Sequence, residues 1–249
     1  SINIMETSRR IAIVPAAGKP TNKILMHTNL PDTMLPINGK PVIGYILDDL
    51  IARNINDAII VLNSADNQTE NYVTKKFGAK LSLTITYNQA YERGLGYSII
   101  SAVEHIHQAA SVLVYLGDTI YKGDLDLNAD FLVTSHNYES SEKWCFIERT
   151  ANTDTFINKP KEYVGDGLVL SGLYHFTDID KFKSAAAHAA KTNEKIEISH
   201  ILEAYKQPFE LIPAESWYDC GNIENFYRAK IDFLKTRSFN TVIYNDLYG

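Results

Sequence analysis

Two aspartates stand where the sequence could hold a divalent metal ion. Asp118 follows a buried apolar run, residues 111–116, and a single glycine. A carboxylate after a central strand is well placed to hold Mg²⁺ against the phosphate oxygens of a nucleotide. Asp219, in the segment 217–221, is a second candidate. Both have a structural alternative, because aspartate also forms turns before helices and caps their first turn.

A turn of small residues follows the first apolar strand. Ala16, Ala17 and Gly18 follow the apolar residues 11–14 after a single proline, Pro15. Without bulky side chains, such a turn lets backbone N–H groups approach a nucleotide base or its phosphates. Small residues also end strands for packing reasons, so the turn alone leaves both interpretations open.

Two polar side chains could contact the same ligand. Lys159, before Pro160, is a candidate phosphate-binding charge, although a single lysine is usually a surface residue. Gln89, five residues before Gly94, carries an amide that could read the polar edge of a base.

Several catalytic signatures are absent from the sequence. There is no GxxxxGK[ST] phosphate loop, no GxSxG nucleophile turn, no helical HxxxH pair and no GxGxxG after the first strand. Cys145 and Cys220 stand 75 positions apart, which excludes a CxxC zinc motif and indicates two reduced thiols.

The first half of the chain alternates strands and helices that would position these residues. Apolar runs predict strands at 11–14, 58–62, 81–87 and 111–116, helical periodicity predicts helices at 41–51 and 95–107, and a polar helix is expected at 67–77. This order predicts right-handed crossovers and a mainly parallel sheet covered on both faces. The ligand crevice of such a sheet lies at the carboxyl ends of its strands, where Gly18 and Asp118 both stand.

The second half is mixed. It predicts strands at 144–149, 167–176 and 217–219 and helices at 178–191, 197–205 and 223–234. Residues 238–249 are too apolar for a free tail. We expect them to pack on the domain, to cover a partner, or to begin a second domain.

Composition limits the function classes. The chain has 249 residues, 45% of them hydrophobic, and a net charge of −6 without a Lys/Arg run, which argues against a nucleic-acid binder. No apolar run reaches the roughly 18–20 residues that span a bilayer, and the first residues do not form a signal peptide. We therefore expect a cytoplasmic protein with no membrane anchor.

The motifs follow one another in a recognisable order. They are residues 16–18, the block Leu35-Pro36-Ile37-Asn38-Gly39-Lys40-Pro41, Gln89 with Gly94, Asp118, Asn158-Lys159-Pro160, 171–174, Glu197 and Trp217-x-Asp219-x-Gly221. Over roughly residues 10–235 the chain resembles the sugar-phosphate nucleotidyltransferases, also called nucleotide-sugar pyrophosphorylases. Members couple a nucleoside triphosphate to a sugar 1-phosphate or similar phosphorylated molecule and release pyrophosphate.

The resemblance implies an α/β fold, a doubly wound, Rossmann-like (GT-A-like) domain with a mixed, mainly parallel central sheet. The domain would span residues 1–237. The activity that the resemblance implies is that of an Mg²⁺-dependent nucleotidyltransferase that makes precursors of surface polysaccharides. A homo-oligomer and a fused second domain are both left open.

The resemblance also assigns roles to individual residues. Asp118 and Asp219 would bind Mg²⁺, and Lys159 would join them as a catalytic residue on the acceptor phosphate. The nucleotide would contact Ala16, Ala17, Gly18, Lys19, Lys23, Gln89 and Gly94. The acceptor would contact Gly172, Tyr174 and Glu197.

The chain departs from the family where positive charge is expected. The family loop GxGTR is here Gly18-Lys19-Pro20-Thr21-Asn22, and a later lysine is replaced by Asp32. Three alternatives follow. Lys19 or Lys23 supplies the missing charge, or the domain uses a nucleoside diphosphate sugar as glycosyltransferases do, or catalysis is lost and the domain binds a ligand or regulates a partner.

Overall fold

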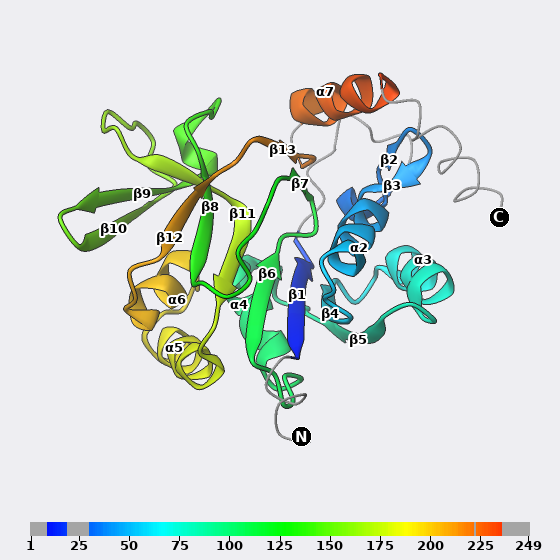
Figure 1. Cartoon of the computed structure of the whole chain (residues 1–249), viewed down its shortest axis with the longest axis horizontal. Coiled ribbons are helices and arrows are strands. Elements are labelled where there is room, and N and C mark those ends of the chain that lie inside the picture. Colours follow the sequence, from blue (N-terminus) through cyan, green and yellow to red (C-terminus); the bar gives the residue numbers. More distant parts are fainter. Residues whose placement is uncertain (1–8, 19–29, 222, 236–249) are drawn as a thin grey trace.

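The computed structural model describes residues 9–18, 30–221 and 223–235. Lys19, Lys23 and residues 238–249, which carry three of the predictions above, lie outside these ranges. Within them, nine strands form one mixed sheet that runs through the molecule, with helices on both faces (Figure 1). None of the helices in the described ranges is both long and apolar enough to cross a bilayer.

The parallel part of the sheet is built from the first half of the chain. β1 (Arg10–Ala16) lies between β4 (Asp57–Leu62) and β6 (Ser111–Tyr115), and β5 (Ser82–Tyr87) continues the sheet beside β4. All three pairings are parallel, as the alternation of strands and helices predicts. Their carboxyl ends therefore meet at one edge.

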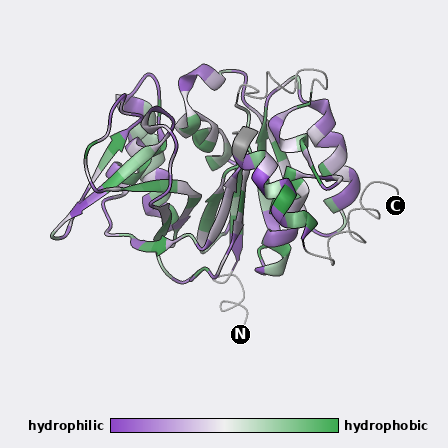
Figure 2. Ribbon diagram, turned by 90° about the horizontal axis from the view of Figure 1, so that it is seen from above, coloured by the Kyte–Doolittle hydropathy of each residue, from purple (hydrophilic) through white to green (hydrophobic). Residues whose placement is uncertain are grey.

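Three helices cover this part of the sheet. The side chains of β1 alternate between two cores. Ala12 and Val14 pack with α2 (Val42–Ala52) and α3 (Asn67–Phe77), whereas Ile11 and Ile13 pack with α4 (Leu95–Val103). Figure 2 shows hydrophilic and hydrophobic residues mixed along the same helices, as expected of helices with one buried face.

α4 is shorter than the periodicity predicts. It ends at Val103 rather than near residue 107, because the backbone there forms a tighter turn with an i to i−3 hydrogen bond and then changes direction. The N–H of Ile106 donates to the carbonyl of Val103, and Gln108 adopts a φ of 48° before β6 begins.

The second half adds antiparallel strands around β11 (Leu168–Phe176). β11 pairs with β6, β8 (Phe131–Ser135) and β9 (Cys145–Thr150), so it joins the two halves of the sheet. The outer strands are β10 (Thr153–Asn158), beside β9, and β12 (Glu210–Pro213), beside β8.

The remaining elements lie around this sheet. α5 (Ile179–Thr192) and α6 (Ile198–Tyr205) pack on the α4 face, and α7 (Ile223–Leu234) lies on the other. Short strands form two ribbons, β2 (Pro36–Ile37) with β3 (Lys40–Pro41), and β7 (Thr119–Lys122) with β13 (Ser216–Asp219). The 3₁₀ turns are η2 (Asp32–Met34), η3 (Tyr91–Arg93) and η4 (Ser141–Lys143).

Candidate active site

The carboxyl ends of β1, β4 and β6 open onto a cavity of about 790 Å³. The starts of α3 and α4 and the turn η2 complete its wall. Five residues singled out in the sequence line it, namely Ala16, Ala17, Gly18, Gly94 and Asp118. Residues separated by a hundred positions thus share one cavity, at the edge where a parallel sheet binds its ligand.

Two different physical causes explain why the residues at this edge are small. The N–H of Gly117 donates to the carbonyl of Pro15 (2.9 Å), and a Cβ on Gly117 would lie 2.7 Å from the Cβ of Ala16. These residues are therefore small because two strand ends touch. A Cβ on Gly18 would meet no atom of the described residues within 4 Å, so packing leaves room there for a ligand.

Gly94 is held by the protein itself. Its φ is +95°, and a Cβ there would lie 2.3 Å from the carbonyl oxygen of Ile196. The N–H of Gly96 donates to the same carbonyl (2.8 Å), and the N–H of Ile196 donates to the carbonyl of Arg93 (2.7 Å). The beginning of α4 is thereby fastened to the segment that precedes α6.

Gly94→Ala is expected to lower the free energy of unfolding by about 1–3 kcal/mol, because a side chain there is strained by φ and by Ile196. Thermal unfolding measures this. The matched control is Gly18→Ala, which should leave the melting temperature nearly unchanged and weaken nucleotide binding instead. Equal melting temperatures for both variants would contradict the packing role of Gly94.

Gln89 is exposed, and it is not among the residues that line the cavity. Its neighbour Asn88 is buried, and the Asn88 amide donates to the hydroxyl of Ser98 (2.8 Å), a cavity residue. Asn88 also accepts a hydrogen bond from the N–H of Ala90. Sequence reasoning missed Asn88. A polar residue directly after a strand was its only signal, and the contact of Gln89 with the base stays a prediction.

Strand register brings the two candidate metal ligands together. Asp219, the last residue of β13, lies opposite Thr119 in β7, next to Asp118. The N–H of Cys220 donates to the carbonyl of Asp118 (2.7 Å). Asp118 precedes a strand, so the alternative of a turn before a helix is wrong. Asp219 accepts from the N–H of Gly221 (3.1 Å), a turn that comes before α7 begins.

Both carboxyl groups are harder to ionise than an ordinary aspartate. Burial, with the negative charge of Asp32 added, raises the pKa of Asp118 to about 6. Burial and the charge of Asp118 raise the pKa of Asp219 to about 8, against a smaller opposing effect of Lys143. The site therefore gathers negative charge in a place that water reaches poorly, which favours a bound cation.

The donor set suits Mg²⁺ shared with a nucleotide. In the described part of the chain, no group of three Asp, Glu, His or Cys side chains forms a complete metal site. Two carboxylates are what Mg²⁺ needs from a protein when phosphate oxygens and water fill its other positions. Asp118 and Asp219 fit that arrangement.

The metal-free protein is expected to lose stability as the pH rises from about 4 to 8. The folded-state pKa values of about 6 and 8 lie above the ordinary 3.8, so over this range the folded chain binds more protons than the unfolded chain. Mg²⁺ competes with those protons, so it should raise the melting temperature more at about pH 8.5 than at about pH 5.5. Thermal unfolding with and without MgCl₂ tests both statements.

Asp118→Asn provides the comparison, because it removes one titrating group and the repulsion on Asp219. Its melting temperature should vary less with pH than that of the wild type. An identical pH profile for both proteins would contradict the electrostatic pairing of the two aspartates.

Two lysines lie near the buried carboxylate of Glu197, one of the three predicted acceptor residues. Lys159 Nζ lies 3.8 Å from Glu197 Oε2, and Lys195 Nζ lies 3.7 Å from Glu197 Oε1. Glu197 is buried, whereas both lysines extend toward solvent. Lys195 was not among the sequence candidates, and its only signal was its place two residues before Glu197. Two cations on one carboxylate can receive a phosphate between them.

Gly172 and Tyr174, the other two predicted acceptor residues, both belong to β11 but have different neighbours. Gly172 has a φ of +93° within an irregular stretch of the strand, and its carbonyl accepts from the N–H of Leu116 (3.0 Å). A Cβ on Gly172 would lie 2.6 Å from Thr119 Oγ1. Tyr174 is buried in the core, where burial, Cys145 and Asp118 raise the pKa of its hydroxyl. The contact of Tyr174 with the acceptor stays a prediction.

Sequence comparison identifies similar proteins. Residues 12–236 match the family model described as Nucleotidyl transferase. A UTP–glucose-1-phosphate uridylyltransferase of Staphylococcus saprophyticus is 25% identical over an alignment that covers 92% of this chain and 93% of that protein. Another from Haloferax volcanii is 24% identical, with 67% of this chain and 71% of that protein covered.

Structural comparison agrees with the predicted fold. The crystal structure of a UDP-glucose pyrophosphorylase complexed with UDP-glucose superimposes with a TM-score of 0.74 at 20% identity, covering 92% of this chain and all of that chain. A UDP-glucose pyrophosphorylase from Acinetobacter baumannii gives a TM-score of 0.73 at 16% identity. The doubly wound, Rossmann-like fold is thus confirmed.

Proposed function

The chain belongs to the nucleotidyl transferase family, and on that premise we propose that it transfers a nucleotidyl group from a nucleoside triphosphate to a sugar 1-phosphate and releases pyrophosphate. The observation that carries the proposal is the cavity at the carboxyl ends of β1, β4 and β6, which Asp118 lines, with Asp219 opposite the neighbouring Thr119. The Lys159–Glu197 ion pair is our candidate for holding the acceptor phosphate. The names of the relatives favour UTP and glucose 1-phosphate as the first substrates to try.

The reaction is an in-line displacement at the α-phosphorus of the triphosphate. An oxygen of the acceptor phosphate forms a bond to that phosphorus, the bond to the bridging oxygen of the β-phosphate breaks, and pyrophosphate leaves with that oxygen. Proton transfer is not required, so the protein mainly positions two anions and neutralises charge.

The residues divide this work. Mg²⁺, when bound by Asp118 and Asp219, supplies positive charge to the phosphates. Lys159 holds the acceptor phosphate. Glu197, whose Oε2 lies 3.8 Å from Lys159 Nζ, keeps the lysine side chain extended toward that phosphate. Backbone groups of residues 16–18 and 94 face the nucleotide in the cavity wall. In this proposal Lys19 or Lys23 supplies the positive charge that neutralises the triphosphate where the family has Arg and Lys.

Asp32 supports a second candidate function. It lines the nucleotide cavity, where a nucleotidyltransferase of this family has a lysine in the resembling motif. A carboxylate there opposes a triphosphate more than it opposes a diphosphate. The alternative is therefore a protein that binds a nucleoside diphosphate sugar, either as a glycosyltransferase does or without turnover.

For the first function, nucleotidyl transfer, the setting that we propose is the supply of surface-polysaccharide precursors in the cytoplasm.

Pyrophosphate release separates these functions. The assay combines each nucleoside triphosphate with Mg²⁺ and a panel of sugar 1-phosphates, and we expect turnover with at least one pair. Tight metal-dependent binding of UDP-glucose without pyrophosphate release would support the glycosyltransferase-like function. Binding that neither depends on metal nor leads to turnover would indicate a domain that has lost catalysis and binds a ligand or regulates a partner.

Lys159→Ala is expected to raise the KM for the sugar 1-phosphate by about 10- to 100-fold, because it removes a charge-assisted hydrogen bond to the acceptor phosphate. The KM for the nucleoside triphosphate should change little. Steady-state kinetics with each substrate varied in turn measure both constants. Lys161→Ala, an exposed lysine two residues on, is the matched control. Equal effects of the two variants would contradict the assignment of Lys159.

A further inference from the structure

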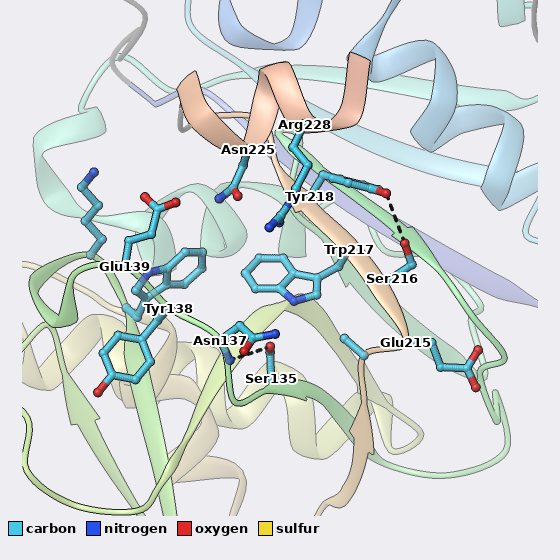
Figure 3. A pocket seen from close by; sticks show the side chains of 13 residues that line it. Ser135, Asn137, Tyr138, Glu139, Glu215, Ser216, Trp217, Tyr218, Asn225 and Arg228 are labelled. Atoms are coloured by element: carbon cyan, nitrogen blue, oxygen red, sulfur yellow. Dashed lines mark hydrogen bonds between the residues drawn. The ribbon is translucent and has the colours of Figure 1, made fainter. Parts of the chain in front are cut away.

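The cavity drawn in Figure 3 belongs to the site already described. It has a volume of about 310 Å³, and Figure 3 shows Trp217, of β13, in the middle of its lining. The positive charge of Lys143 in this lining acts on Asp219, and the carbonyl of Trp144 accepts from the N–H of Lys159 (2.9 Å). This space is therefore a part of the proposed reaction site rather than a second site.

A larger cavity lies at the opposite edge of the main sheet. It has a volume of about 680 Å³, and its lining includes the first residues of β1, β4 and β6, which are Arg10, Asp57 and Ser111. We call it the amino-edge cavity. The carboxyl ends of the same three strands open onto the nucleotide cavity. Because β1 has seven residues that rise about 3.3 Å each, roughly 20 Å of strand separates the two cavities.

Two neighbouring arginines line the amino-edge cavity, and only one of them is held by the protein. The Arg9 guanidinium donates to both carboxylate oxygens of Asp57 (3.0 and 2.7 Å) and to the carbonyl of His107 (3.1 Å). Arg10 is partly buried, and among the residues that the structure describes its guanidinium has no hydrogen-bond or ion-pair partner. Since Arg9 neutralises Asp57, the lining keeps the positive charge of Arg10.

Strand register places a buried hydroxyl beside this charge. Ser111 lies opposite Arg10 across β6 and β1, and residues paired in this way project to the same face of a sheet. Ser111 is only 5% exposed, and its hydroxyl has no hydrogen-bond partner in the described ranges. A buried hydroxyl without a partner costs free energy unless water or a ligand bonds to it.

Three amides complete the polar part of the lining. Asn54 follows α2, Asn56 precedes β4, and Asn128 precedes β8. Within the part of the chain that the structure describes, no hydrogen bond occupies any of these three side-chain amides. Each amide offers both donors and an acceptor, so together they suit a ligand that carries hydroxyl groups.

Two carboxylates near the amino-edge cavity are occupied by the protein's own donors. Asp130 accepts from the N–H and the hydroxyl of Thr177 (2.7 and 2.9 Å) and from the hydroxyl of Tyr205 (2.9 Å). Asp126 accepts from the N–H of Asn128 (3.0 Å). Neither carboxylate lines the cavity. Their negative charge opposes long-range attraction of an anion, so Arg10 must contact an anionic ligand directly.

We propose that the amino-edge cavity binds a phosphorylated small molecule, an organic phosphate whose phosphate group contacts Arg10 and Ser111. A guanidinium matches two phosphate oxygens with two parallel N–H groups, and a hydroxyl donates to a third. The volume lies within the range of small-molecule sites, about 300–1,000 Å³, so it holds more than inorganic phosphate. The asparagine amides then contact the hydroxyls of the ligand. This site does not depend on nucleotidyl transfer at the other edge.

Isothermal titration calorimetry tests the proposal without any reference to turnover. The protein is first freed of metal by dialysis, and no nucleotide is present. The probe is glucose 6-phosphate, and inorganic phosphate, glucose and malate are titrated separately. We expect saturable binding of glucose 6-phosphate, weaker binding of inorganic phosphate, and no binding of glucose, because the phosphate carries the charge and the sugar adds hydroxyl contacts.

Variants assign the binding to this cavity. Arg10→Gln should weaken the affinity for glucose 6-phosphate about tenfold or more, because a charge-assisted hydrogen bond is lost. Asn128→Ala, a change at an exposed loop position that strand pairing does not involve, should weaken it about fivefold. Lys161→Gln removes one positive charge from an exposed loop and should leave the affinity unchanged. Melting temperatures show that each variant is folded.

Lys159→Ala separates this site from the acceptor site, and it should bind glucose 6-phosphate as the wild type does. Loss of binding in Lys159→Ala with full binding in Arg10→Gln would place the phosphate at the acceptor residues and overturn the proposal. No saturable binding of either phosphate, or binding that neither Arg10→Gln nor Asn128→Ala weakens, would overturn it as well. Binding of malate without binding of glucose 6-phosphate would show a carboxylate site, which also contradicts an organic phosphate.

Discussion

Asp118→Asn is expected to reduce Mg²⁺-dependent turnover by about 10²–10³-fold or more, while leaving the fold intact. The amide keeps the size of the side chain and loses the negative charge that a divalent cation needs. Asp118 lies just after β6 in the lining of the cavity, and Asp219 of β13 lies opposite its neighbour Thr119, so the loss of this charge leaves one of the two proposed metal ligands. Nucleotide binding should also lose its dependence on Mg²⁺.

Stability should respond in the opposite direction. Asp118 raises the pKa of Asp219 through like charge, so its replacement by a neutral amide relieves repulsion in the metal-free protein. The melting temperature of Asp118→Asn near pH 8 should equal or exceed that of the wild type. A variant that loses activity and stability together would indicate a structural role instead.

Calorimetry of nucleotide binding with and without Mg²⁺, together with kcat, measures the first effect. Asp166→Asn, a change of the same kind at an exposed loop position, is the matched control. Unaltered Mg²⁺-dependent binding in Asp118→Asn would show that the metal ligands are elsewhere.

Asp32→Lys is expected to strengthen binding of a nucleoside triphosphate by at least about tenfold. Asp32 lines the nucleotide cavity, and its charge acts on both Asp118 and Asp219. Two unit charges about 4 Å apart interact by about 4 kcal/mol at an effective dielectric of 20, and water and salt reduce the effect at an open cavity. Asp32→Asn removes the repulsion alone, so its affinity should fall between those of wild type and Asp32→Lys.

Salt dependence and a charge-matched variant identify the mechanism. The affinity gain of Asp32→Lys should shrink as the salt concentration rises. Glu104→Lys makes the same change of +2 in net charge at the far end of α4, and it should not improve binding. Weaker triphosphate binding in Asp32→Lys would mean that the carboxylate acts with the metal rather than against the phosphates.

The double change Asn22→Arg with Asp32→Lys extends this test to the loop outside the described residues. If the altered charges limit turnover, the double variant should release pyrophosphate faster than the wild type. If the wild type is already fast, Lys19→Ala and Lys23→Ala should slow it, by about 10²-fold where either lysine neutralises the transition state. Full activity in both lysine variants would contradict the charge argument.

Sequence pattern was sufficient for the parallel half of the fold. Residues 58–62 and 111–116 are apolar runs bounded by polar residues, and their strands are buried on both faces, so composition alone marks them. Helical periodicity located α2 for the same local reason, and α3 was expected as the polar helix that follows the second strand. The position of Asp118 followed, because the end of a central parallel strand is a ligand edge in any such sheet.

The short strands were not predicted from the sequence, because they are defined by pairing with strands elsewhere in the chain. β7 and β12 have four residues each, too few for a periodic signal, and their partners β13 and β8 lie about 80–100 positions away. β8 is fully buried yet was not predicted, and it exists as a strand between β11 and β12. Local propensity carries no information about such distant partners.

The site shows the same division between local and distant causes. Residue types and their order were enough to select Asp118, Asp219, Lys159 and Glu197, since each matched a motif within a few positions. Only tertiary structure decided that Asp219 stands beside Thr119, that Lys195 shares Glu197 with Lys159, and that Gly94 is pressed against Ile196. These facts depend on strand register and on close approach between segments that lie about 40 to 100 positions apart for three of the four pairs, and the order of residues along the chain does not specify such approaches.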